Sequence, residues 1–199
     1  MLWELLVSAA LLPADVLRPS REDEAAWVAA ACAGDATAFR RIVEQHHRSL
    51  YLMAARLIGD AVEAQDLVQE SFAKAYLNLD RFDPSYRLST WLHRITLNTC
   101  RDYLKCARRR ERASTPDLME QIDDAPHPEE QLATKVTARR VQLALSRLKP
   151  SYREVLVLKD LQGLSYGEIK RITGTPVTAL KIRAVRARAK LKSELEIER

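Results

Sequence analysis

Residues 148–191 contain two helix signals separated by a single tight turn, and this is the most restrictive feature of the sequence. Ser165 is a suitable N-cap, and Glu168, three residues later, is placed to bond back to the cap, as in a capping box. Gly174 favours the left-handed turn that ends this helix, and Thr175-Pro176 suits the N-cap and first residue of the next. Two closely linked helices with a basic second member are typical of a helix-turn-helix that binds DNA.

The helix that follows Pro176 separates into two faces. Residues at spacings of three and four form an apolar stripe on one face: Val177, Leu180, Ala184, Ala187 and Leu191. The opposite face carries Thr178, Lys181, Ile182, Val185, Arg186 and Ala189. The alternative to DNA binding at this stage is an ordinary helical bundle with a solvated basic face.

The composition favours an all-α fold with substantial cores. The chain has only five glycines, 47% of its 199 residues are hydrophobic, and the alternating pattern of β-strands is almost absent. Cys32, Cys100 and Cys106 have neither the spacing of a disulfide framework nor that of a metal site. We therefore expect no cofactor, no metal and a reducing cytoplasm.

Charge divides the chain into alternating segments. Residues 35–110 hold 13 basic and nine acidic residues, residues 111–134 hold one and seven, and residues 135–199 hold 16 and six. Two basic blocks flanking an acidic strip predict two small helical domains that face a polyanion, joined by an acidic flexible linker. The predicted divisions are an N-terminal extension of unassigned role at 1–34, a first domain at 35–110, the linker at 111–130 and a helix-turn-helix domain at 131–199.

Capping residues and apolar spacing predict where the helices lie. Asp35 and Asp60 are suitable N-caps, Gly34 and Gly59 suitable stops, and Pro84 lies in a predicted loop. The expected helices cover 27–33, 36–58, 61–79, a segment from Ser89 or Thr90 to 110, a segment from near Glu129 or Leu132 to 148, and 151–161.

Three stretches, in this order, resemble the extracytoplasmic-function (ECF) sigma factors of bacterial RNA polymerase, over roughly residues 35–192. Residues 64–72 (AQDLVQESF) are similar to the polymerase-binding helix of that family, and residues 89–98 (STWLHRITLN) to its promoter-melting helix. Residues 164–169 (LSYGEI), with Arg183 and Arg186, are similar to its helix-turn-helix. The resemblance implies a factor without enzymatic activity that gives core RNA polymerase its promoter specificity.

Asp66, Gln69 and Glu70 are the candidate polymerase-binding residues. Asp66 and Glu70 are four residues apart, so their carboxylates lie on one helix face, with Gln69 beside them. A metal-dependent nuclease is the enzymatic alternative for such a pair, but no further ligand accompanies it, so we expect no catalysis. The resemblance implies that this face docks on the beta-prime subunit of the polymerase, and that the partner as a whole is core polymerase with its beta-prime and beta subunits.

The loop at 80–87 and the helix after it carry the candidate residues for the −10 promoter element. Strand opening requires a base to leave the stack and be held, for which aromatic rings and amides are suited, while basic residues bind phosphates. The candidates for base stacking and reading are Phe82, Tyr86 and Asn98. The candidates for phosphate contacts are Arg94, Arg101, Lys105 and Arg108, although Arg108 also suits a solvated helix end. The resemblance places this loop over the upstream strand of the −10 element. Trp91 is interpreted as a core anchor between helices rather than a stacking wedge.

The candidate residues for the −35 element lie on the last helix: Thr178, Lys181, Ile182, Arg183, Val185 and Arg186. Arg186 and Lys181 suit guanine, and Thr178 and Arg183 suit phosphates. The sequence departs from the family at Lys170, Ala179 and Ile182. The apolar pair Ile182 and Val185 suits either thymine methyl groups or a protein surface.

The partners implied by the resemblance are core RNA polymerase, promoter DNA and an anti-sigma protein, with no small-molecule substrate. Many anti-sigma proteins are membrane-bound, which would hold the chain at the inner face of the membrane. The main alternative is a helix-turn-helix regulator that acts without polymerase. That alternative predicts a sensor or receiver domain, but residues 35–110 show no βαβ pattern.

Overall fold

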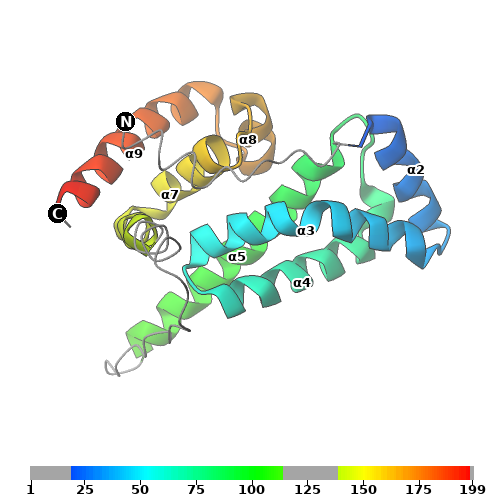
Figure 1. The fold of residues 1–199 in the computed structure, drawn as a ribbon, viewed down its shortest axis with the longest axis horizontal. Helices are drawn as coiled ribbons and strands as arrows, with labels where there is room; N and C mark the ends of the chain where they lie inside the picture. Colours follow the sequence, from blue (N-terminus) through cyan, green and yellow to red (C-terminus); the bar gives the residue numbers. More distant parts are fainter. Residues whose placement is uncertain (1–18, 114–138, 198–199) are drawn as a thin grey trace, which may run out of the picture.

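The computed structural model describes residues 19–113 and 139–197, which form two groups of helices (Figure 1). Within these ranges every regular element is a helix, which confirms the predicted all-α class. Residues 1–18 of the extension, residues 114–130 of the predicted linker and residues 131–138 lie outside the described residues, and so does the predicted start of the helix near Glu129 or Leu132.

The first group consists of α2 (Arg21–Cys32), α3 (Ala36–Ile58), α4 (Ala61–Leu77) and α5 (Leu88–Ala113). The Asp35 side chain accepts hydrogen bonds from the first backbone N–H groups of α3, and Asp60 does the same for α4. Gly59 ends α3 in the left-handed conformation, at φ 92°. These caps and the stop at Gly59 confirm the sequence predictions.

Three helices of the first group differ from the prediction. α4 ends at Leu77 rather than at residue 79. α2 begins at Arg21 rather than near Trp27, because Ser20 caps it and forms a reciprocal capping box with Asp23. α5 begins at Leu88, ahead of the predicted Ser89 or Thr90, and continues to Ala113, past the predicted start of the linker at residue 111. A 3-10 turn, η1 (Leu79–Arg81), opens the loop between α4 and α5.

The core of the first group lies between α3, α4 and α5. Its fully buried side chains include Ile42, Leu50, Met53, Val68, Leu92 and Leu97. Truncation of a side chain of this kind to alanine costs about 2–5 kcal/mol, because apolar contact is lost and a cavity remains. The core therefore fixes the angles at which α4 and α5 present their outer faces.

The second group consists of helical residues 139–147, α7 (Pro150–Leu156), the π-helical turn η2 (Val157–Leu161), α8 (Tyr166–Thr173) and α9 (Val177–Ile197). The predicted capping box is present, since Glu168 N donates to Ser165 Oγ at 3.2 Å and Ser165 N donates to Glu168 Oε2 at 2.8 Å. Gly174 takes φ 73°. α9 begins one residue later than predicted, because the Pro176 carbonyl is its first acceptor, from Leu180 N.

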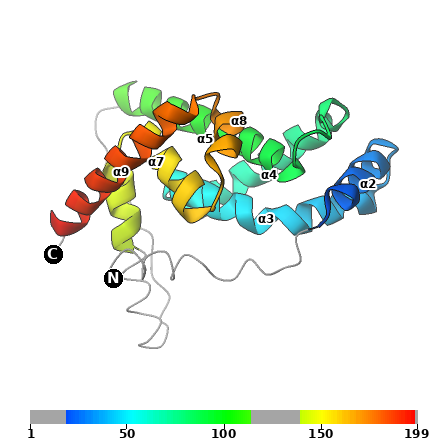
Figure 2. The same cartoon turned by 90° about the horizontal axis from the view of Figure 1, so that it is seen from above.

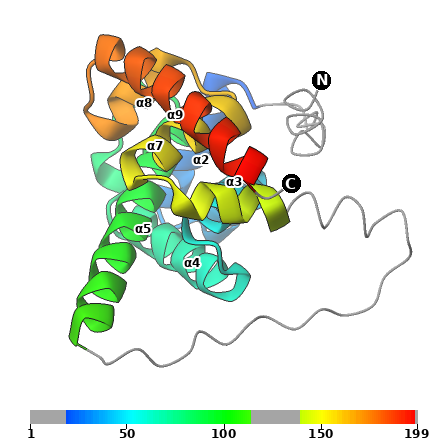
Figure 3. The same cartoon turned by 90° about the vertical axis from the view of Figure 1, so that its left-hand side faces the viewer.

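The second group packs across α3 and α5 of the first (Figures 2 and 3). At the C-terminal end of α3, Gln142 Nε2 donates to the Arg56 carbonyl at 3.2 Å, and Arg153 Nη1 donates to the Leu57 carbonyl at 2.6 Å. Further along α3, Gln162 Nε2 donates to the Ser49 carbonyl at 3.2 Å. The two groups thus share a polar as well as an apolar contact.

Candidate nucleic-acid and polymerase interfaces

The predicted polymerase-binding residues lie together on the outer face of α4. Asp66, Gln69 and Glu70 are exposed, whereas Leu67 and its buried neighbours pack into the core. Glu70 Oε1 forms an ion pair with Lys74 Nζ at 2.7 Å, with both side chains about half exposed. Solvent screening makes such a pair weak, so Glu70 remains accessible to a partner.

The same face of α4 carries exposed apolar residues at its two ends, which the sequence prediction missed. Val62 is 72% exposed and Leu77 is 77% exposed. Spacings of three and four place them in line with Asp66 and Gln69, along one side of the helix. We define the α4 face as Val62, Asp66, Gln69, Glu70, Ala73 and Leu77. Extending the helical period in both directions from Asp66 would have found these two side chains.

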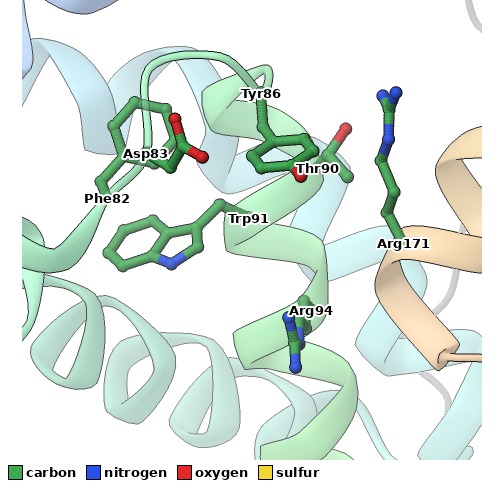
Figure 4. Close-up of a pocket in the computed structure, with 7 residues that line it drawn as sticks. All are labelled: Phe82, Asp83, Tyr86, Thr90, Trp91, Arg94 and Arg171. Carbon is green, nitrogen blue, oxygen red and sulfur yellow. The ribbon is translucent and has the colours of Figure 1, made fainter.

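A pocket of about 240 Å³ lies beside the loop between α4 and α5 (Figure 4). Its lining residues are Phe82, Asp83, Tyr86, Thr90, Trp91, Arg94 and Arg171. The Phe82 and Trp91 rings lie 5.4 Å apart between centroids, at 56°. Trp91 is half-buried and packs against the core, as predicted, but it also lines the pocket. The aromatic surfaces and guanidinium groups suit a base and its phosphate.

Asp83 shapes the loop at the mouth of this pocket. Its Oδ1 accepts a hydrogen bond from Ser85 N at 2.8 Å, which lowers the pKa of the carboxyl, and the Ser85 side chain lowers it further. The carboxylate is therefore ionised near neutral pH and fixes a local turn. That turn carries Tyr86 toward α5, where its ring lines the pocket.

The other predicted −10 residues follow one face of α5. Alternating spacings of four and three align Arg94, Asn98, Arg101, Lys105 and Arg108. All are exposed except Arg101, which is half-buried. Lys105 forms a solvent-exposed pair with Asp102 at 3.0 Å, which leaves its charge available. We call these five residues, with Phe82 and Tyr86, the α5 face.

Two side chains of the second group reach the α5 face, and local sequence patterns carried no signal for either. Arg101 donates from Nε to Glu154 Oε1 at 2.8 Å and from Nη2 to Glu154 Oε2 at 2.7 Å. This hydrogen bonding raises the pKa of Arg101 above its ordinary value. The Arg171 guanidinium carbon lies 5.2 Å from the centre of the Tyr86 ring, in cation–π contact.

The predicted −35 residues occupy the outer side of α9. Thr178, Lys181, Ile182, Val185 and Arg186 are exposed, and Arg183 lies at the edge of this face. Ile182 is 55% and Val185 is 65% exposed, so apolar atoms form the centre of the face. On the other side, Leu180, Ala184, Ala187 and Leu191 are buried, as the stripe predicted. We call the six predicted residues the α9 face.

An ion pair within the second group holds α9 in place. Arg188 donates to Asp160 of η2 from Nε at 3.1 Å and from Nη2 at 2.6 Å. The Asp160 side chain is only 9% exposed. This bidentate pair and the buried stripe fix which side of α9 faces outward.

The described residues contain no cluster of three or more histidine, cysteine or acidic side chains that could hold a metal ion. Cys100 is buried, and Cys32 and Cys106 are exposed and free. Over the same ranges no helix is long and apolar enough to cross a membrane.

Two sigma-70 families match the chain in the order of the two helical groups. Residues 42–110 match sigma-70 region 2, and residues 138–191 match sigma-70 region 4. The first match covers α4 and nearly all of α5, and the second covers the helix-turn-helix. A helix-turn-helix regulator that acts without polymerase would need a sensor or receiver domain ahead of its helix-turn-helix. In this chain, the residues at that place match sigma-70 region 2 instead.

Curated relatives and solved structures belong to the same family. The chain is 34% identical to the ECF RNA polymerase sigma factor SigW of Bacillus subtilis, over 81% of this chain and 91% of that one. It is also 34% identical to SigM of Mycobacterium tuberculosis, over 87% and 85%.

Among solved structures, CnrH in complex with the cytosolic domain of CnrY matches with a TM-score of 0.67 and 30% identity, over 89% of this chain and 99% of that one. RpoE in complex with the anti-sigma factor NepR, from Bartonella quintana, matches with a TM-score of 0.66 and 27% identity, over 81% and 98%. With both sigma-70 regions present in order and relatives matched over most of their length, the chain belongs to the extracytoplasmic-function sigma factors.

Proposed function

We propose that this sigma factor divides promoter recognition between its two helical groups. The first group docks on core RNA polymerase and opens the −10 element, and the second reads the −35 element. One observation carries the proposal: sigma-70 regions 2 and 4 match the same chain in order, and each match coincides with an outward-facing helix of suitable chemistry. The product is a promoter-specific initiation complex, and the chemistry of RNA synthesis remains with the polymerase.

The α4 face is the proposed polymerase contact, made with the beta-prime subunit. Its acidic and amide centre suits a basic partner helix, and charge complementarity sets the orientation of docking. Val62 and Leu77 supply apolar contact at the two ends, where they are exposed in the chain alone. Burial of such side chains on binding contributes affinity in proportion to the apolar area removed from water.

The α5 face is the proposed −10 contact. Phe82 and Trp91 form the aromatic wall of the pocket, so a base that leaves the stack has a surface on which to rest. Arg94 lines the pocket and Lys105 lies further along the same face, where both can bind phosphates of the strand that carries that base. Asn98 supplies amide donor and acceptor groups between them.

The α9 face is the proposed −35 contact, lying in the major groove. Arg186 and Lys181 have donors for the O6 and N7 acceptors of guanine. Ile182 and Val185 are well exposed and have the apolar surface that a thymine methyl group requires. Thr178 and Arg183 lie at the rim, toward the phosphates.

An anti-sigma protein is the proposed regulator. Support comes from two similar sigma factors, CnrH and RpoE, whose structures were solved in complex with the cytosolic domain of CnrY and with the anti-sigma factor NepR. We propose that the chain acts in the cytoplasm and is held at the inner membrane face where its anti-sigma protein is membrane-bound. A genomic library screened for open reading frames that silence a promoter dependent on this chain would identify the partner.

Run-off transcription with purified core polymerase and a promoter library tests the central proposal. The chain should direct synthesis from a subset of promoters that share −10 and −35 sequences. Transcripts made equally well without the chain would contradict the proposal. A chain that binds promoters but never associates with core polymerase would also contradict it. The second outcome would favour a regulator that acts without polymerase docking.

A further inference from the structure

The loop that carries the aromatic residues of the α5 face begins and ends against α2, the helix that precedes the region 2 match (Figure 1). Where the loop begins, Leu79 of η1 is 4% exposed and packs in a small buried cluster with Ala31 of α2. Where the loop ends, the backbone N–H of Leu88 donates to Glu24 Oε2 of α2 at 3.2 Å. One helix therefore contacts both ends of the loop.

Glu24 replaces a cap that α5 lacks in its own sequence. The residue directly before α5 is Arg87, whose side chain has no acceptor for the first N–H groups of the helix. The three helices before it, α2, α3 and α4, are each capped by the residue that directly precedes them: Ser20, Asp35 and Asp60. A carboxylate at a helix N-terminus also lies at the positive end of the helix dipole. Glu24 thus supplies from another helix what a local side chain supplies elsewhere.

The carboxylate of Glu24 lies in the interior, where its hydrogen bonds are specific. Glu24 is 5% exposed. Burial raises the pKa of Glu24, whereas the hydrogen bond from the Leu88 N–H and the charge of Arg87 lower it. A buried acceptor that loses its donor keeps the full cost of its desolvation, so α5 is strongly favoured to begin at Leu88. The contact therefore fixes the last residues of the loop relative to α2.

These contacts lie directly behind the pocket of the α5 face. Tyr86, which lines the pocket, is two residues before Leu88. Trp91, in the first turn of α5, lines the pocket and also packs against the cluster that contains Leu79. A shift in the start of α5 would move both rings relative to Phe82, on the opposite side of the loop. The shape of the pocket therefore depends on α2, although no residue of α2 lines it.

We propose that Glu24 is a positioning residue for the −10 contact, and that it holds the loop in the form that receives an unstacked base. Glu24 is buried and does not itself contact DNA. It acts through the Leu88 N–H, which sets the end of the loop and thereby the place of Tyr86. This inference rests on the proposed function of the α5 face, and it adds α2 to the elements on which that function depends.

Amide hydrogen exchange, followed by NMR on the full chain, tests whether Glu24 holds the loop. In Glu24→Leu the acceptor is gone, so the Leu88 amide should exchange about tenfold faster or more. In Glu24→Gln the side-chain oxygen can still accept from the Leu88 N–H, so exchange should stay within about threefold of the parent rate. Glu22→Leu changes an exposed acid in the same turn of α2 and is the matched control, which should leave the Leu88 amide unaltered.

Binding of a fluorescein-labelled mixed-sequence single strand measures the effect on the site. If the competent form of the loop falls to about a tenth of the population, Glu24→Leu should bind the strand about tenfold more weakly than the parent chain. Glu24→Gln and Glu22→Leu should bind it as the parent does. Adding Glu24→Leu to Tyr86→Ala should cause little further loss, because the two changes act on the same ring. Affinities for core polymerase and for duplex promoter DNA should not change, since the α4 and α9 faces are not involved.

The outcomes separate positioning from a general role in folding. Lower stability of Glu24→Leu in urea with unchanged strand affinity would overturn the proposal. Equal losses of affinity for strand, duplex and polymerase would also overturn it, and so would strand binding by Glu24→Gln as weak as that by Glu24→Leu. If circular dichroism shows lost helicity in Glu24→Leu, Glu24→Asp carries the same tests, because it keeps the charge and withdraws the carboxylate from Leu88 by one methylene.

The same measurements distinguish this proposal from the proposed function. Strand binding that depends on Glu24, in a chain that never associates with core polymerase, would support the positioning role and overturn the sigma-factor function. Polymerase association and promoter-specific transcription at parent levels in Glu24→Leu, with parent strand affinity, would overturn the positioning role alone.

Discussion

Arg101 of α5 and Glu154 of α7 form a bidentate ion pair, with N–O distances of 2.8 and 2.7 Å, although 53 positions separate them in the chain. The pair connects a residue of the proposed −10 contact to the domain proposed to read the −35 element. Removing one partner of this shielded pair would leave the other charge without compensation, so the pair fixes the orientation of the second group on α5 more than it adds to net stability. In the proposed function, a contact between Arg101 and the −10 strand would replace this pair.

Reversal of charge on the α4 face should abolish polymerase binding. The variant Asp66→Arg with Glu70→Arg replaces an acidic centre by a basic one on an exposed surface, so we expect at least tenfold weaker binding to core polymerase and unchanged helicity. Surface plasmon resonance with immobilised core polymerase measures this. Glu196→Arg, a charge reversal on the far end of α9, is the matched control. Wild-type affinity in the double variant would show that polymerase docks elsewhere.

Leu77→Asp tests the apolar end of the same surface. Leu77 is 77% exposed, so the change should leave the free energy of unfolding nearly unaltered while removing apolar contact from the docked complex. We expect weaker binding to core polymerase in the same assay. A loss of binding accompanied by a large drop in unfolding free energy would instead assign Leu77 a role in folding.

Arg186→Ala should weaken binding to the preferred −35 sequence by about 1–3 kcal/mol, because a bidentate contact to guanine is lost. Fluorescence anisotropy with the preferred site and with a scrambled duplex of equal length gives the comparison. Lys192→Ala, outside the α9 face, serves as the control for general loss of positive charge. An equal loss on both duplexes would make Arg186 a phosphate contact.

Thymine methyl groups should contribute to −35 affinity through Ile182 and Val185. Replacement of the thymines of the preferred site by uracil removes only the methyl groups, and each one contacted should cost about 0.8 kcal/mol. Val185→Ala should reduce that penalty, because the apolar partner is smaller. The four combinations of protein and duplex form a double-mutant cycle. If the change from thymine to uracil costs the same binding free energy in Val185→Ala as in the parent protein, Val185 does not contact the thymine methyl groups.

His46 should make the first group less stable as the pH falls. Burial lowers the pKa of His46 to about 4, and its Nε2 lies 3.8 Å from Glu24 Oε1, too far for a hydrogen bond. The unfolded chain, with a histidine pKa of about 6.5, therefore takes up a proton that the folded chain resists, so stability is lost as the pH falls from about 6.5 toward about 4.

Urea unfolding at pH 7 and pH 5.5 measures this effect. His46→Gln should show a smaller fall in unfolding free energy between the two pH values, by about 1 kcal/mol. His47→Gln, a change at the neighbouring and less buried histidine, is the control. Burial also raises the pKa of Glu24, which makes the folded chain more stable as the pH falls and so opposes the effect of His46. The comparison with His46→Gln isolates the histidine, because Glu24 is present in both proteins. Identical pH dependence in all three proteins would contradict the assignment.

Local chemistry accounts for most of what the sequence predicted. Asp35, Asp60 and Ser165 cap helices whose first N–H groups lie two or three residues away, and Gly59 and Gly174 end helices in the left-handed conformation. These are short-range effects, and they are visible in a window of a few residues. The buried and exposed sides of α9 follow in the same way from the helical period.

The tertiary structure decided what depends on residues far apart in the chain. α5 begins at Leu88 because the Leu88 N–H donates to Glu24 Oε2 of α2 at 3.2 Å, a cap that lies 64 positions away. Arg171 approaches Tyr86, and Glu154 approaches Arg101, only because the second group packs on α3 and α5. The sequence alone determined the family, the outward faces of α4, α5 and α9, and the helix ends that depend on local caps. Which of those faces is covered was decided by packing, because side-chain partners across a domain contact leave no periodic pattern in either segment.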